Sequence, residues 1–421
     1  MTARSESSSN TPKRSRTSNV DSGPPSAERP KTSDDEPLLV RLGVRYFRNL
    51  SSKVRPLEAL DAVHLLNASE REALRRIERG AIVRAAIAGG ISTIVAAAVE
   101  VGVAMPLYGH RHPTFGDQVR FYAIVGAATV VTSVIEILYL YWDGLRAVHR
   151  LSHEAGLDLF PTQDDDKALA AAMARAALEL PNPTTGLFGV DPRREASKLR
   201  LVAASLVYKL KVSVTNFLVK ALVRRMLGRA FVRGWLPFVA VPITAGWNAL
   251  VCWLIMREAR IRAMGPSAAR EMIDIAFAGE RPLSARGKAA VLRAVASSIV
   301  RTEDLHPNLA ALLREVALRV RDVPRLDPRE RLDAADDAGD LDDSRAFLAA
   351  IGRLDRAEQR IVLRVLAIAS IIDGRLTRAE KRLLVEARSV CSLPADLSGV
   401  ERLRRAFIDG DPIEPARIST L

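Results

Sequence analysis

The chain has 421 residues, of which 48% are hydrophobic and 26% charged, and a net charge of +13 with a pI near 10.2. This length allows two or three domains, whereas two cysteines exclude a disulfide framework and a clustered zinc site. The positive charge predicts an anionic partner, either nucleic acid or the phosphate surface of a membrane. Because the chain also contains long apolar runs, the membrane is the simpler explanation.

Residues 1–38 are rich in Ser, Thr, Pro and charged residues and lack the apolar core of a secretory signal. We expect this tail to be disordered, since such a composition buries too little apolar surface to fold. Its basic run, residues 13–16, is offset by the acidic residues 34–36. A solvated tail is therefore favoured over a site for nucleic acid or lipid.

Residues 39–80 are predicted to form cytoplasmic helices that lead into the membrane. Ser69 and Glu72, three residues apart, match a capping box at the start of a helix that continues into the first span. Arginines gather just before that span, at positions 71, 75, 76, 79 and 84. The positive-inside bias then predicts that this end lies in the cytoplasm.

Residues 81–143 are predicted to form a transmembrane hairpin. Two apolar runs, residues 85–108 and 121–142, are each long enough to cross a hydrocarbon core of about 30 Å at a rise of about 1.5 Å per residue. Between the runs lie only two arginines, Arg111 and Arg120, so we expect this loop outside. Small residues four apart, such as Ala85 and Gly89, favour close helix packing.

Each span carries one acid, Glu100 in the first and Glu136 in the second. Intramembrane acids are candidates for ion or proton transport because they are costly to keep there. In a regular hairpin these two differ in depth by on the order of 12 Å, so they are not expected to form one site. Transport therefore stands as an alternative to acids that snorkel or bond to a neighbouring helix.

Residues 144–194 are predicted to form a polar connector. His149 and His153 stand four apart with Glu154 beside them, which is a spacing that can hold a metal on one helix face. No third ligand is defined by the sequence, so a packed or interfacial histidine pair is the favoured interpretation.

Residues 195–264 are predicted to form basic and apolar membrane-associated helices. The stretch from Glu195 to Gly234 holds nine Lys or Arg and one acid, together with enough apolar residues to lie against lipid. Nucleic-acid binding is the alternative, and it is disfavoured because few aromatic side chains are present for base stacking.

Residues 235–256 contain no charge and form a possible further span. Pro237 and Pro242 interrupt the first half, so a re-entrant or interfacial hairpin is also open. We favour an arrangement that keeps the C-terminal region cytoplasmic. The segment from Leu236-Pro237 to the Arg-rich exit at residues 257–262 loosely resembles the C-terminal part of EcsC-type membrane-associated proteins.

Residues 280–421 are predicted to form a soluble all-α bundle. Apolar residues recur at spacings of three and four. Two pairs, Asp355 with Glu358 and Thr377 with Glu380, match helix N-terminal caps. The expected helices lie near residues 285–301, 307–321, 344–353, 356–372, 377–391 and 399–407.

One segment of this bundle, residues 367–380, resembles the repeat of TerB-like domains, named for tellurite-resistance protein B. In that repeat a helix ends at Asp-Gly and a Thr cap with a Glu opens the next helix, which Asp373, Gly374, Thr377 and Glu380 match. The resemblance implies metal binding through acidic residues, so Asp373 and Glu380 are the candidate metal ligands. The alternative is that they only cap and terminate helices.

The spacing from Gly374 to Glu380 also equals that between the glycine and last acid of an EF-hand loop. The first two ligand positions would be Ala369 and Ile371, which have no side-chain oxygen. A high-affinity calcium loop is therefore excluded.

No nucleophile–base pattern, Gly-rich phosphate loop or helix-borne zinc motif is present, and His306 has no partner visible in the sequence. We therefore expect no catalytic residue and no cofactor other than a divalent metal at the two acids. The sequence predicts an all-α protein made of a transmembrane hairpin, membrane-associated helices and a C-terminal helical bundle.

The function that best fits is a non-enzymatic, multi-pass protein of the bacterial inner membrane. Its N-terminus is cytoplasmic and it anchors a cytoplasmic TerB-like interaction domain, with envelope or metal stress as a setting. The expected partners are the bilayer, anionic lipid head groups and other membrane or cytoplasmic proteins; nucleic acid is not expected. The alternative is a small transporter or channel subunit that uses Glu100 or Glu136.

Overall fold

The computed structural model describes residues 36–53, 63–108, 114–160, 167–183, 190–192, 236–320, 341 and 343–421. These residues form twelve helices and no strand, which confirms the all-α prediction for the described part of the chain. The tail up to residue 35 and the basic stretch 195–234 lie outside the described residues. The helices are α1 (Leu38–Ser51), α2 (Ala68–Tyr108), α3 (Phe115–Glu154), α4 (Lys167–Ala177), α6 (Leu236–Phe277), α7 (Ala285–Thr302), α8 (Pro307–Val320), α10 (Ser344–Ile351), α11 (Arg356–Ala369), α12 (Arg378–Val390), α13 (Ser398–Asp409) and α14 (Pro415–Ser419).

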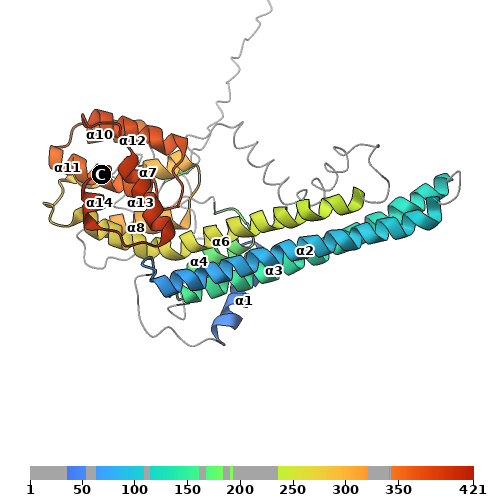
Figure 1. The fold of residues 1–421 in the computed structure, drawn as a ribbon. Helices are drawn as coiled ribbons and strands as arrows, with labels where there is room; N and C mark the ends of the chain where they lie inside the picture. Colours follow the sequence, from blue (N-terminus) through green and yellow to red (C-terminus); the bar gives the residue numbers. More distant parts are fainter. Residues whose placement is uncertain are drawn as a thin grey trace, which may run out of the picture. The chain divides into compact units, whose positions relative to one another are not determined.

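Three long helices, α2, α3 and α6, lie side by side (Figure 1). Each contains a segment that is long and apolar enough to cross a membrane: Ala68–Val103, Phe115–Glu154 and Ala240–Phe277. The two predicted spans of the hairpin lie within α2 and α3, and the possible third span lies within α6. By length and composition the chain therefore has three candidate membrane spans.

The start of α2 differs from the sequence prediction in its cap. Asn67 is the capping residue: its Oδ1 accepts the Glu70 amide at 2.9 Å, and Glu70 Oε2 accepts the Asn67 amide at 2.8 Å. The prediction of Ser69 and Glu72 is therefore wrong by two residues. Both pairs fit the same motif, and the earlier pair begins the helix. The predicted continuation of this helix into the first span is confirmed.

Helix α6 is one continuous helix of 42 residues. The predicted re-entrant or interfacial hairpin within residues 235–256 is therefore wrong, because Leu236 to Met256 is helical throughout. Pro237 lies in the first turn, where a missing amide hydrogen costs little, and Pro242 is accommodated inside the helix. The helix also continues through Gly265 and Pro266 into the C-terminal region.

Large apolar side chains on these three helices are exposed. Their exposed fractions, between about half and two thirds, would be costly in water over such a continuous surface. Lipid tails remove that cost, so the pattern is that of helices embedded in a bilayer. The exposed residues include Ile87 and Ile91 of α2, Val130, Val134 and Leu138 of α3, and Leu250 and Trp253 of α6.

The C-terminal bundle consists of α7, α8 and α10–α14 packed around the second half of α6, seen at the left of Figure 1. The six helices expected here are all present, within a few residues of the predicted limits. Thr377 and Glu380 form the predicted capping box of α12. Asp355 caps α11 as predicted, whereas Glu358 turns away and accepts the Ser284 amide at 2.7 Å.

The bundle contacts the first turns of α2. The Leu66 amide donates to the Gly410 carbonyl at 3.1 Å, and Arg71 forms an ion pair with Asp411 at 2.7 Å. Residues Leu38–Leu421 accordingly form one compact unit. The bundle therefore lies at the end of the long helices where α2 begins.

Candidate functional site

Four polar side chains and one backbone carbonyl join the three long helices inside their apolar segments, and we call this set the polar seam: the Gly89 carbonyl and Thr93 of α2, Glu136 of α3, and Thr244 and Asn248 of α6. Glu136 is 3% exposed and Asn248 is 4% exposed. Asn248 Nδ2 donates to Glu136 Oε1 at 2.7 Å. The sequence prediction that an intramembrane acid bonds to a neighbouring helix thus describes Glu136.

The seam continues between α2 and α6 through two threonines. The Oγ1 atoms of Thr93 and Thr244 lie 2.6 Å apart, and Thr93 also donates to the Gly89 carbonyl at 2.8 Å. A Cβ on Gly89 would lie 2.5 Å from Asn248 Nδ2. Glycine therefore leaves room for the close approach of the two helices, as small residues allow in membranes.

Glu100 lies apart from the seam. Gly89 is level with Asn248, and therefore with Glu136, while Glu100 is eleven residues further along α2. That separation is about 16 Å along the helix axis. The two intramembrane acids do not meet, as the hairpin geometry predicted.

An ion pair marks the end of the apolar segments nearest the bundle. Arg84 Nε donates to both oxygens of Asp143, at 2.9 and 3.1 Å. Next to Asp143, the Trp142 ring lies 5.5 Å from the Arg146 guanidinium. Trp and Arg at the end of a span are typical of the membrane–water interface.

Beyond that interface, α6 carries a buried polar network into the bundle. Glu258 Oε1 lies 3.0 Å from His306 Nε2 and accepts from Arg262 Nε at 2.9 Å. His306 is 1% exposed. No partner for this histidine was visible in the sequence, and the fold supplies one 48 positions away; no spacing rule connects the two residues.

Asn308 continues the connection between α6 and the bundle. Its Nδ2 donates to the Ile261 carbonyl of α6 at 2.9 Å and to the Ile372 carbonyl at 2.8 Å. A Cβ on Gly265 would lie 2.0 Å from Asn308, so the glycine permits this contact. The turn after α11 is thereby connected to α6 through the Asn308 side chain.

The two candidate metal ligands, Asp373 and Glu380, lie in and just after that turn and are both buried. Glu380 Oε2 accepts the amide and the hydroxyl of Thr377, each at 2.9 Å, and Ser298 Oγ donates to Oε1 at 3.0 Å. Asp373 Oδ1 accepts the Arg375 amide at 2.8 Å. The carboxylate of Glu380 is thus bonded on both oxygens by the protein.

Burial raises the pKa of Glu380 to about 8, and the nearby charge of Asp373 acts in the same direction, against the hydrogen bonds from Thr377 and Ser298. Burial also raises the pKa of Asp373. A protonated carboxyl is a poor metal ligand. Among the described side chains, no group of three or more His, Cys, Asp or Glu is placed to hold a metal ion. Capping by Glu380 is observed, and metal binding stays a prediction.

The histidine pair of the connector also has a structural explanation. His149 is 5% exposed, its Nε2 lies 3.0 Å from Ser51 Oγ, and its ring lies 5.9 Å from that of Phe47. These contacts fasten α1 to α3, which fits the packed interpretation of His149. His153, one turn later, is partly exposed.

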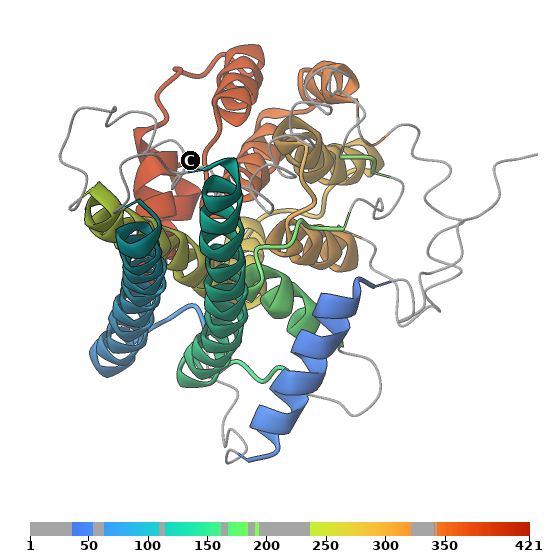
Figure 2. The same ribbon diagram turned by 90° about the vertical axis from the view of Figure 1, so that its right-hand side faces the viewer.

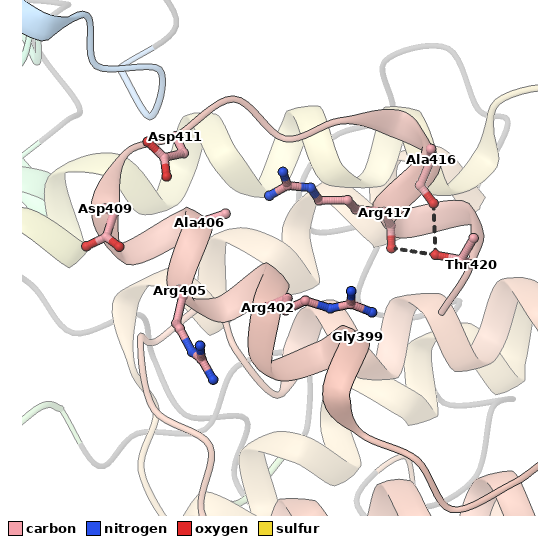
Figure 3. A pocket seen from close by; sticks show the side chains of 9 residues that line it. All are labelled: Gly399, Arg402, Arg405, Ala406, Asp409, Asp411, Ala416, Arg417 and Thr420. Carbon is pink, nitrogen blue, oxygen red and sulfur yellow. Dashed lines mark hydrogen bonds between the residues drawn. The ribbon is translucent and has the colours of Figure 1, made fainter.

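A pocket of about 410 Å³ lies between α13 and α14 (Figure 3). Its charges are of both signs, and Asp411 is already paired with Arg71 while Arg417 is paired with Glu414 at 3.3 Å. The charges are thus partly satisfied within the protein, and they select no ligand class. The lining residues are Gly399, Arg402, Arg405, Ala406, Asp409, Asp411, Ala416, Arg417 and Thr420.

No family model, curated protein or solved structure matches this chain.

Proposed function

We propose that this chain is a non-enzymatic, multi-pass protein of the bacterial inner membrane that holds a helical interaction domain at the cytoplasmic surface. The observation that carries the proposal is the continuity of α6, which begins among the apolar helices and ends inside the bundle. Glu258, Ile261 and Gly265 on this one helix contact bundle residues. The domain and its anchor therefore share one continuous helix.

The cytoplasmic side is proposed from charge and contacts together. Arginines cluster at the start of α2, and the positive-inside bias assigns such an end to the cytoplasm. The bundle contacts the same end through Asp411 with Arg71 at 2.7 Å, and the second half of α6, on which the bundle packs, contacts it through Arg260 with Glu78 at 3.5 Å. The C-terminus then lies on the same side of the membrane as the start of α2, whatever route the chain takes between residues 192 and 236.

The interaction role is proposed from the resemblance of residues 367–380 to TerB-like domains. Its support is the observed capping box and the positive φ of Gly374, which reproduce the helix–turn–helix expected for that repeat. A role in envelope or metal stress, and the protein partners that it requires, rest on the resemblance alone.

The transporter alternative has less support. Glu136 already accepts a hydrogen bond from Asn248 and lies about 16 Å from the level of Glu100, so the two acids offer no continuous path. The seam has the chemistry of helix association.

The proposal is tested by fractionation and by reporter fusions. Full-length protein is expected in the membrane fraction, released only by detergent. A reporter active in the cytoplasm should work when fused after Leu421 and fail when inserted between residues 108 and 114, and a periplasmic reporter should give the reverse. Recovery of the protein in the soluble fraction without detergent would refute membrane anchoring, and periplasmic activity at Leu421 would refute the proposed side.

A further inference from the structure

Helix α1 presents three different faces. Val40, Gly43 and Phe47 recur at spacings of three and four and are buried. On another side of the helix, Leu38, Leu39 and Leu42 are 64%, 41% and 52% exposed. The remaining flank is basic, with the exposed arginines 41, 45 and 48.

The contacts of α1 place it just beyond the end of the second span. A Cβ on Gly43 would lie 3.3 Å from the Leu145 side chain, and Phe47 packs on His149. Leu145 and His149 follow Trp142 by three and seven residues, which is about 5 and 10 Å along α3. That interval overlaps the head-group layer, which is about 6 Å thick on each side of the hydrocarbon core.

The direction of α1 suits this position. Gly43 meets Leu145 and Phe47 meets His149, so the start of α1 lies toward Trp142 and its end lies away from it; Figure 2 shows α1 beside α3. The Arg48 guanidinium lies 5.5 Å from the ring of Phe160, which follows the end of α3 and so lies away from the span. The Arg48 end of α1 therefore lies away from the bilayer, and Leu38, Leu39 and Leu42 lie at the end nearest to it.

We propose that α1 is an interfacial helix whose Leu38, Leu39 and Leu42 insert into the lipid leaflet on the bundle side of the membrane. This inference rests on the proposed membrane anchoring of α2, α3 and α6. The partner is the boundary between lipid head groups and acyl chains, where amphipathic helices bury an apolar face by about 5–10 Å. The leucine flank thereby extends the exposed apolar surface that α3 carries up to Trp142.

The consequence is a second, lateral attachment of the protein to the membrane. His149 is bonded to Ser51 and packed on Phe47, so α1 is held firmly against α3. An inserted leucine flank then fixes how α3, and with it the bundle, is rotated relative to the bilayer surface.

The test uses full-length protein in which the two buried cysteines are removed by Cys252→Ala and Cys391→Ala. Single cysteines are introduced by Leu39→Cys, Leu42→Cys or Arg45→Cys on α1, and by Val130→Cys at an exposed mid-span site of α3. Each is labelled with an environment-sensitive fluorophore and reconstituted into liposomes. Quencher-bearing lipids then report depth, with the quencher placed either near the head group or deep in the acyl chain.

We expect the shallow quencher to reduce fluorescence at positions 39 and 42 and to leave position 45 unchanged, while the deep quencher reduces fluorescence at position 130. Quenching at 130 with none at 39 and 42 overturns the interfacial helix and leaves the anchoring intact. A second copy or another protein that covers this flank would give this same result. Equal quenching at 39, 42 and 45 overturns the proposed orientation of α1. Absence of quenching at 130 overturns the anchoring itself, and the inference with it.

Discussion

Glu136 of α3 and Asn248 of α6 are 112 positions apart in the sequence, yet their side chains share a 2.7 Å hydrogen bond at buried positions. The bond crosses between two helices inside the segments that are long and apolar enough to span a membrane. It therefore fixes the rotation of α6 against α3 where apolar contacts alone specify little.

Replacing Asn248 should weaken the packing of the three helices. Asn248→Leu removes the donor to Glu136, and interhelical hydrogen bonds in membranes contribute about 0.6 kcal/mol on average and up to about 1.7. We expect a loss of this size in the free energy of unfolding, measured by titrating the micelle-bound protein with a denaturing detergent. Leu250→Ala, at an exposed position on the same helix, is the control and should change little. Equal stability of Asn248→Leu and wild type would contradict the structural role of the bond.

A methyl group on Gly89 should separate α2 from α6. Its Cβ would meet Asn248 at 2.5 Å, and overpacking of this kind costs about 1–3 kcal/mol. Gly246→Ala is the matched control, because no atom lies within 4 Å of a Cβ there. In the same unfolding assay Gly89→Ala should be destabilised and Gly246→Ala should not. Similar effects of both substitutions would show that close approach at Gly89 is unimportant.

The intramembrane acids should not support ion flux. Wild-type protein in liposomes is expected to show the same proton and cation leak as empty liposomes, and the double variant Glu100→Gln, Glu136→Gln should not alter it. The reason is that Glu136 is engaged in helix packing and Glu100 is distant from it. Flux above the background that the double variant abolishes would instead establish the transporter function.

The contribution of Glu380 to the stability of the bundle should fall as pH rises between about 4.5 and 8. The pKa of Glu380 is raised from 4.5 to about 8 in the folded protein, so in this window the native state binds more protons than the unfolded state. The free energy of unfolding then decreases with pH, by at most about 1.4 kcal/mol for each pH unit crossed in this window.

Thermal unfolding of the protein at pH 5, 6.5 and 8 tests this slope. Glu380→Gln should flatten the pH dependence, while Glu386→Gln, on an exposed position of the same helix, should leave it as in wild type. The same pH dependence in Glu380→Gln as in wild type would show that Glu380 is ionised in the native bundle.

The amino-acid sequence determined the parts of this structure that depend on neighbours along the chain. The positions of the six bundle helices and the Thr377–Glu380 capping box follow from apolar periodicity and from caps, which act within one or two turns. The candidate spans of α2 and α3 follow from the length of apolar sequence. Even here the local rule failed where two caps overlapped, as at Asn67 and Ser69.

The tertiary structure alone decided what those elements do to one another. Pro242 and Pro266 are interruptions by local preference, yet α6 runs through both because packing against α2 and α8 outweighs that preference. Glu136 and His306 found partners 112 and 48 positions away. Such pairings depend on how helices approach in space, and no spacing along the chain encodes them.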